Sequence, residues 1–74
     1  MGSDLKRSLT IAGHRTSLSL EPEFWEALQR ESARRNISVA ALVSEIDQSR
    51  GIRNLSSAIR VWLLGVVSVP RQTY

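Results

Sequence analysis

Hydrophobic and polar residues alternate near the start of the chain. The alternation places Leu9 and Ile11 on one side of a strand and, a few residues later, Leu18 and Leu20 on one side of a strand. Such a period of two is typical of half-buried β-strands. The first pair is odd-numbered and the second is even-numbered, so an unbroken strand cannot put both pairs on one face. Gly13 lies between the pairs, and its backbone freedom permits either a bulge in one long strand, which we favour, or a tight hairpin.

From residue 21 onward the spacing of apolar residues becomes helical. It predicts three helices, over about 21–35, 38–49 and 54–67. Boundary signals accompany the pattern, namely Pro22 in a first turn, Asn36 as a left-handed residue after a helix, Ser38 as an N-cap, and Gly51 and Pro70 as stops. The chain is therefore predicted to be mainly α, with one short strand before the helices.

The apolar positions of the strand and of the first two helices form one predicted core. Its members are Leu18, Leu20, Phe24, Leu28, Leu42, Val43 and Ile46. Trp25 is expected on the flank of the first helix, and Trp62 in the core or at an interface. A 74-residue monomer buries only about 60% of the surface of its unfolded chain, so oligomerisation is the expected supplement. We therefore interpret the seven residues as the core of a dimer.

The chain is basic, and its basic residues are almost all arginine. Ten Lys and Arg oppose seven Asp and Glu, which gives a net charge of +3, and nine of the ten are Arg. The guanidinium group suits phosphates and base edges better than an ammonium group does. This balance favours an anionic partner, and nucleic acid over a lipid surface.

Several function classes find no support in the sequence. Cysteine is absent and His14 is the single histidine, so we expect no disulfide, no metal site and no cofactor. No cysteine or paired carboxylates lie near His14, and the serines are interpreted as helix caps and strand positions, so we expect no enzyme. His14 is expected to shape a turn or to touch a phosphate. The most apolar run, 61–69, is far shorter than the about 20 residues that a membrane span needs.

The strand around residues 15–19 raises the question of its partner. A single strand has two bare edges, and the simplest partner is the same strand of a second chain, antiparallel across a twofold axis. Arg15, Ser17 and Ser19 then form a polar outer face. A two-stranded ribbon fits the major groove of DNA, where Arg holds guanine and Ser bonds either kind of base edge. The alternative is a solvated strand face without a binding role.

The stretch RTSLSLEPEFWEAL (15–28), followed by RNISVAALV (35–43), resembles the ribbon-helix-helix family of DNA-binding proteins of the Arc/MetJ type. With GHRTSLSLEPEFW (13–25) and NLSSAIRVWLL (54–64), the chain looks more specifically like short bacterial proteins of this family. The resemblance implies an intertwined homodimer in which Arg15, Ser17 and Ser19 read DNA bases. It also implies that the start of the second helix grips a phosphate, and the expected phosphate contacts are Lys6, Arg7, His14, Ser38, Val39 and Ala40.

These observations divide the chain into a flexible basic arm over 1–7, a ribbon-helix-helix domain over 8–50, an additional C-terminal helix over 51–70 and a tail over 71–74. The expected function is that of a transcriptional regulator, cytoplasmic and nucleoid-associated. It would act as a homodimer with a β-ribbon in the major groove, with higher oligomers on DNA left open. The first alternative is an antitoxin of a toxin-antitoxin pair. The second is a protein-interaction dimer without DNA binding, whose partner contacts the helix over 54–67.

Overall fold

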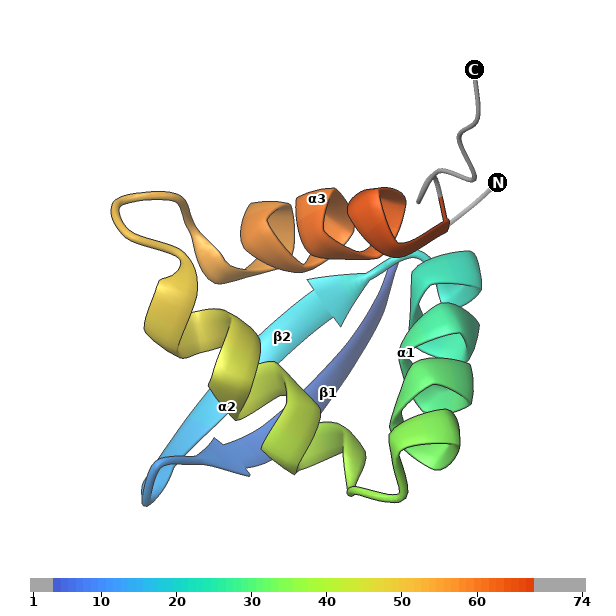
Figure 1. Cartoon of the computed structure of the whole chain (residues 1–74). Coiled ribbons are helices and arrows are strands. Elements are labelled where there is room, and N and C mark those ends of the chain that lie inside the picture. The colour runs from blue at the N-terminus through green and yellow to red at the C-terminus, as the bar shows by residue number, and fades with distance from the viewer. Residues whose placement is uncertain (1–3, 68–74) are drawn as a thin grey trace.

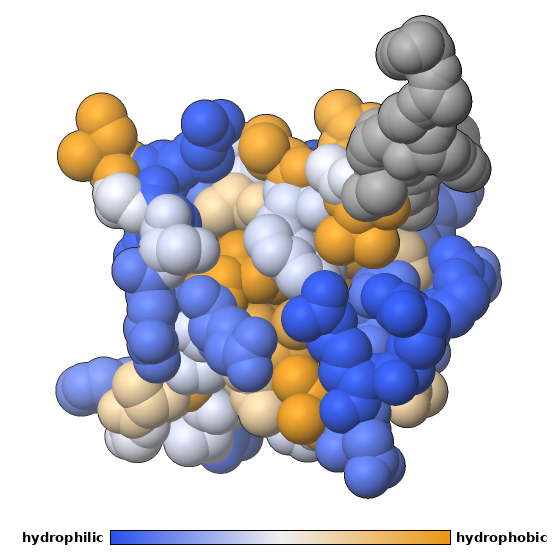
Figure 2. Space-filling model, viewed as in Figure 1, coloured by the Kyte–Doolittle hydropathy of each residue, from blue (hydrophilic) through white to orange (hydrophobic). Residues whose placement is uncertain are grey.

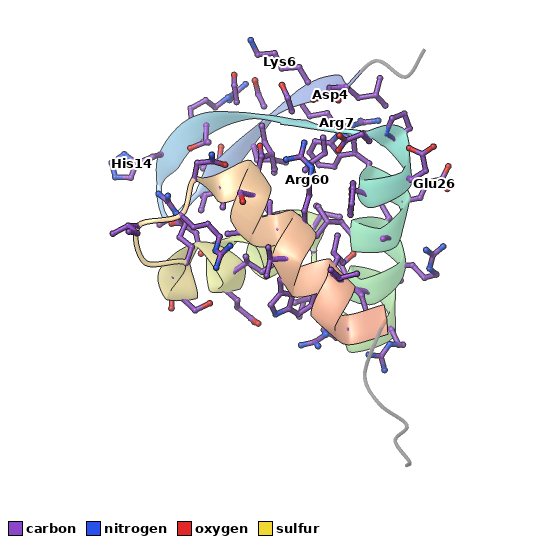
Figure 3. All side chains as sticks on the ribbon, turned by 90° about the horizontal axis from the view of Figure 1, so that it is seen from above. Asp4, Lys6, Arg7, His14, Glu26 and Arg60 are labelled. Carbon is purple, nitrogen blue, oxygen red and sulfur yellow. The ribbon has the colours of Figure 1, made fainter. Side chains whose placement is uncertain are left out.

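The computed structural model describes residues 4–67, which form a β-hairpin followed by three helices (Figure 1). The elements are β1 (Leu5–Ile11), β2 (His14–Leu20), α1 (Pro22–Arg35), α2 (Val39–Ser49) and α3 (Leu55–Val67). The two strands form an antiparallel sheet, and the helices lie to one side of it (Figure 3). The expected stop at Pro70 and the tail over 71–74 lie outside the described residues.

Ala12 and Gly13 form the whole connection between β1 and β2. Both have positive φ angles, 52° and 84°, as a type I′ turn requires. With a two-residue turn, Ile11 faces His14, and each odd-numbered residue of β1 faces an even-numbered residue of β2. The odd and even apolar pairs therefore lie on the same face of the sheet. The hairpin thus explains why the apolar residues are odd-numbered in β1 and even-numbered in β2, and no bulge is needed.

Three expectations for this region are wrong. The bulged strand that we favoured is a hairpin, because the turn absorbs the change of parity. The chain has two strands in place of one, and β2 pairs with β1 of its own chain, so the argument that an unpaired strand demands a second chain loses its premise. Finally, Leu5–Arg7 were expected in a flexible arm but lie in β1, where they pair with β2.

The boundaries expected for the first two helices, and the start of the third, are confirmed. α1 ends before Asn36, whose φ of 60° is left-handed. Ser38 caps α2, because its Oγ accepts a hydrogen bond from the N–H of Ala41 at 3.0 Å. Asn54 caps α3 in the same way, since its Oδ1 accepts a hydrogen bond from the N–H of Ser57 at 2.9 Å. Each cap satisfies a backbone donor that the start of a helix leaves without an intrahelical partner.

The core lies between the sheet and all three helices. Of the seven residues expected there, the buried ones are Leu18, Leu20, Leu28, Leu42, Val43 and Ile46. Phe24 and Trp25 exchange their expected places, because Trp25 is only 3% exposed whereas Phe24 is partly buried. α3 contributes Ile59 and Leu63, and Trp62 packs against the core as a partly buried residue. A single chain therefore encloses this core, with α3 as one of its walls.

Polar contacts join the start of β1, the start of α1 and the middle of α3. The indole N–H of Trp25 donates a hydrogen bond to the carbonyl of Leu5 at 2.9 Å, which satisfies the polar atom of a buried ring. Arg60 of α3 donates to Glu21 at 2.9 Å and lies 3.9 Å from Asp4. The hydrogen bond from Arg60 holds the pKa of the Glu21 carboxyl below its usual range.

Replacing Glu21 by Gln should lower the free energy of unfolding at pH 7, because Arg60 stabilises the ionised carboxylate. A pKa lowered by folding gives stability that is present above the unfolded value of about 4.3 and is lost as the pH falls through the folded value. The urea unfolding free energies of the parent and of Glu21→Gln should therefore converge as the pH falls below the folded pKa of Glu21. Glu26→Gln, which changes an exposed carboxylate of α1, is the control. A difference for Glu21→Gln that stays constant with pH would contradict this account.

Two glycine-to-alanine substitutions should change stability in opposite directions. A Cβ at Gly13 meets no atom within 4 Å, but the φ of 84° strains an L residue, so Gly13→Ala should lower the free energy of unfolding by about 1 kcal/mol. Gly65 lies in α3, where an added Cβ would meet only open space, so Gly65→Ala should raise it by about 0.5–1 kcal/mol. Urea unfolding measures both. A stabilising effect of Gly13→Ala would show that the turn is not left-handed.

Candidate nucleic-acid interface

We define the outer face of the hairpin as the six side chains that point away from the helices. Directly opposite residues of an antiparallel pair lie on the same side of the sheet. The register places Thr10 opposite Arg15, Ser8 opposite Ser17, and Lys6 opposite Ser19. Five of the six are exposed and Ser19 is partly buried. In Figure 3 Lys6 points away from the helices. The outer face thus combines two cations with four hydroxyl groups and carries no carboxylate.

Burial on the other side of the sheet keeps the outer face open. Ile11, Leu18 and Leu20 are buried against the helices. Since side chains alternate along a strand, burying these residues turns their neighbours outward. A slip of one residue in register would move the whole polar set toward the core and the apolar set toward water. The hydrophobic pattern therefore determines which side chains the outer face presents.

Charge is unevenly distributed along the chain. Apart from Asp4, every carboxylate side chain lies between Glu21 and Asp47. The segment 5–20, which contains the hairpin, carries Lys6, Arg7 and Arg15 and no acidic residue. A surface with cations and without carboxylates attracts polyanions and accelerates their association. The segment from residue 48 onward is likewise basic, with Arg50, Arg53, Arg60 and Arg71 and no acidic residue, while α1 and α2 hold most of the acidic residues. The hairpin is thus one of two basic segments of the chain.

The structure brings Arg15, Ser17 and Ser19 together on one face of β2, as the alternation predicted. Their role as base readers stays a prediction. Lys6 was expected in a flexible arm, but it lies on the same face, directly opposite Ser19. A residue assigned to a separate segment thus becomes part of one continuous surface.

Arg7 and His14 lie off the outer face. The guanidinium carbon of Arg7 is 5.3 Å from the centre of the Trp25 ring, a cation–π distance, so strand alternation separates Arg7 from Lys6. His14 follows the turn and faces Ile11, which places it on the side opposite to the outer face. Its exposed ring borders a hollow of about 220 Å³ near Arg50, and Figure 3 shows it at the far end of the hairpin from Asp4.

The sequence reasoning missed Ser8 and Thr10. Both are even-numbered and alternate with Leu9 and Ile11, so they lie on the polar side of β1. This alternation was enough to predict that both side chains are exposed. Only the register of a hairpin, however, places them next to Arg15 and Ser17. The preference for a bulge concealed that connection.

The start of α2 keeps the geometry expected of a phosphate contact. Ser38 is exposed and uses its Oγ to accept the N–H of Ala41, while Val39 and Ala40 are partly buried. The first N–H groups of a helix have no intrahelical partners and favour anions. The contact of Ser38, Val39 and Ala40 with a DNA phosphate stays a prediction.

Residues 4–67 show neither a membrane-spanning helix nor a cluster of metal-binding side chains. None of the helices there is long and apolar enough to cross a membrane. The same residues contain no group of three or more His, Cys, Asp or Glu side chains suited to hold a metal ion.

The sequence matches the ribbon-helix-helix domain family over residues 5–67, and the chain therefore belongs to this family. The match includes both strands and all three helices. Ribbon-helix-helix proteins are generally DNA-binding regulators or antitoxins without catalytic activity.

One solved structure that resembles the chain is that of an uncharacterized protein from Bordetella pertussis Tohama I. It shares 34% sequence identity with a TM-score of 0.75, over 89% of this chain and 57% of that one. The chain thus spans little more than half the length of that protein. No curated protein matches the chain.

Proposed function

We propose that the chain is a sequence-specific DNA-binding protein, a transcriptional regulator that acts as a homodimer at the nucleoid, in the cytoplasm. The observation that carries this proposal is the outer face, an exposed two-stranded surface with Lys6, Arg15 and four hydroxyl groups and no carboxylate. The major groove of B-DNA is about 12 Å wide and admits a two-stranded ribbon. Membership of the ribbon-helix-helix family supports the same partner.

The six side chains of the outer face suit different parts of the DNA. Arg15 reaches far enough to hold the O6 and N7 atoms of a guanine with two hydrogen bonds. Ser17 and Ser19 have short side chains that donate or accept, so they suit close base edges or bridging waters. Lys6 is a compact charge near the other end of the hairpin and suits a phosphate.

The direction of the free backbone groups of β2 supports the homodimer. In a hairpin with a two-residue turn, the pair beside the turn, Ile11 and His14, exchanges backbone hydrogen bonds, and every second pair after it does the same. The pairs in between do not bond to each other. The backbone groups of Arg15, Ser17 and Ser19 belong to these pairs and therefore point to the free edge of β2. The hydrogen bond from Ser56 Oγ to the Ser19 carbonyl, 3.0 Å long, agrees with that direction. A twofold axis at Ser17 would join β2 to the β2 strand of a second copy. Arg15 of each copy would then face Ser19 of the other.

In such a dimer, different strands would contact the bases and the phosphates of the DNA. The two β2 strands form the central ribbon, and each β1 strand lies about 4.8 Å farther out. Lys6 of each copy would therefore approach the walls of the major groove, where the phosphates are. The side chains of Arg15, Ser17 and Ser19 would face its floor.

Arg15→Ala should weaken binding to a preferred DNA site by about 1–3 kcal/mol per copy and relax discrimination at the contacted base. Lys6→Ala should weaken preferred and scrambled DNA alike and reduce the salt dependence by a slope of about one per lost phosphate contact. The measurement is a titration of each variant against a site selected from random DNA and against a scrambled site, at several salt concentrations.

Arg7→Ala is the matched control for Lys6→Ala, because it removes a neighbouring cation that stacks on Trp25 away from the outer face. Its salt slope should equal that of the parent. If Arg15→Ala weakens both DNAs equally, the outer face does not read bases. If the parent binds no DNA at low salt, the regulator proposal fails and the interaction-dimer alternative replaces it.

A proline at Ser17 should prevent dimerisation without unfolding the hairpin. The N–H of Ser17 points to the free edge of β2, so Ser17→Pro keeps the bonds to β1 but removes the donor at the proposed twofold axis. Ser8→Pro makes the same change on the free edge of β1 and is the matched control. Sedimentation should find monomers for Ser17→Pro and dimers for Ser8→Pro, with helical circular dichroism spectra for both. Dimers for both variants would show that β2 is not the interface.

A further inference from the structure

A groove lies between the C-terminal half of α2, the loop that follows it, and α3. Its volume is about 250 Å³, and its lining includes Ile46, Ser49, Arg50, Arg53, Val61 and Trp62. We call it the α2–α3 groove. Figure 2 shows apolar surface in the space between the helices, flanked by hydrophilic surface. The helices that form the groove lie to one side of the sheet, away from the outer face of the hairpin (Figure 3).

The floor and one wall of the groove are apolar. Ile46 and Ala58 are buried members of the core and form the floor. Val61 is 46% exposed, and Trp62 is partly buried. Val61 therefore presents apolar surface to water on a helix whose other face is already packed. A groove of this kind accepts the apolar side chains of an amphipathic helix.

Arginines surround this apolar floor. Arg50 and Arg53 line the groove at the loop, and Arg35, which pairs with Glu31 at 3.5 Å, lies over the ring of Trp62 at 5.0 Å. Arg50 is held in place, because it pairs with Asp47 and donates a hydrogen bond to the carbonyl of Arg53 at 2.7 Å. The guanidinium of Arg53 has no hydrogen bond or ion pair within residues 4–67. No carboxylate belongs to the lining.

We propose that the α2–α3 groove binds an acidic amphipathic segment of another protein. Apolar side chains of the segment contact Val61 and Trp62, and its carboxylates pair with Arg53. Charge complementarity selects this occupant, since an uncharged apolar segment would leave Arg53 without a partner and a basic one would be repelled. The groove and the outer face use different residues, so binding at one does not require binding at the other.

The two tryptophans allow a test with an internal control. A synthetic peptide of about twelve residues, with Leu at helical spacing and Glu at the remaining positions, is added to the isotope-labelled full chain. The indole N–H resonance of Trp62, which lines the groove, should shift, while that of Trp25, which is buried and bonded to Leu5, should stay. A matched peptide with Lys in place of Glu should shift neither.

Variants identify the residues that bind the peptide. Arg53→Glu and Val61→Asp should each weaken peptide binding about tenfold or more, because one reverses a charge at the rim and the other places a charge on the apolar wall. Arg30→Glu, on the exposed surface of α1, and Ile52→Asp, at an exposed apolar residue outside the lining, should bind the peptide as the parent does.

Three results would overturn the proposal. The Trp62 resonance does not move at saturating peptide, or the Lys peptide moves it equally. The third result is a shift of the Trp62 resonance when the protein is diluted without peptide, which would show that a second copy of this chain occupies the groove. DNA titration of the same variants is independent of all three, so a failure here is distinguishable from a failure of the DNA-binding proposal.

Discussion

Ala12 and Gly13, two successive residues with left-handed backbone conformation, form the entire turn between β1 and β2. This constraint sets the register of the hairpin, because a turn of two residues pairs odd positions of β1 with even positions of β2. The register gathers the apolar side chains under the helices and the polar ones on the outer face. It also directs the backbone groups of Arg15, Ser17 and Ser19 away from β1. A turn longer by one residue would separate the polar residues that the two strands now hold side by side.

The net charge of the chain says little about where a polyanion would bind, because most of the arginines described are engaged within the fold. Arg7, Arg35 and Arg60 each lie over an aromatic ring, at 5.3, 5.0 and 5.8 Å from its centre. Arg34 pairs with Glu31, and Arg50 with Asp47. These guanidinium groups pack against apolar surface or neutralise carboxylates. Lys6 and Arg15 on the hairpin make no such contact within residues 4–67, and neither do the guanidinium groups of Arg30 and Arg53. The charge that is open to a ligand therefore lies at these four positions, two of which belong to the hairpin.

The sequence was informative where the determinants are local. Ser38 and Asn36 mark their helix ends by their own side-chain and backbone preferences, and both boundaries are confirmed. Alternation likewise sufficed to place Arg15, Ser17 and Ser19 on one face of a strand. The local signal for the turn was incomplete, since Ala12 stands where an Asn or Asp would announce a type I′ turn. Hence the bulge and the hairpin were both compatible with Gly13.

Other features depend on partners far away in the sequence. The burial of Trp25 requires a hydrogen-bond acceptor for its indole, and the carbonyl of Leu5 that serves is 20 positions earlier. Helical spacing alone therefore favoured Phe24 for the core. The inclusion of Lys6 in the outer face likewise follows from a strand pairing that no short window of sequence contains.

The pairing of β2 within its own chain changes how copies of the protein can meet. In dimers whose only sheet forms between chains, folding and association are one event, and subunits separate only by unfolding. Here the hairpin and the core are complete in one chain, and only an edge is left to join. Subunits of such a dimer can exchange as folded units, on the timescale of dissociation.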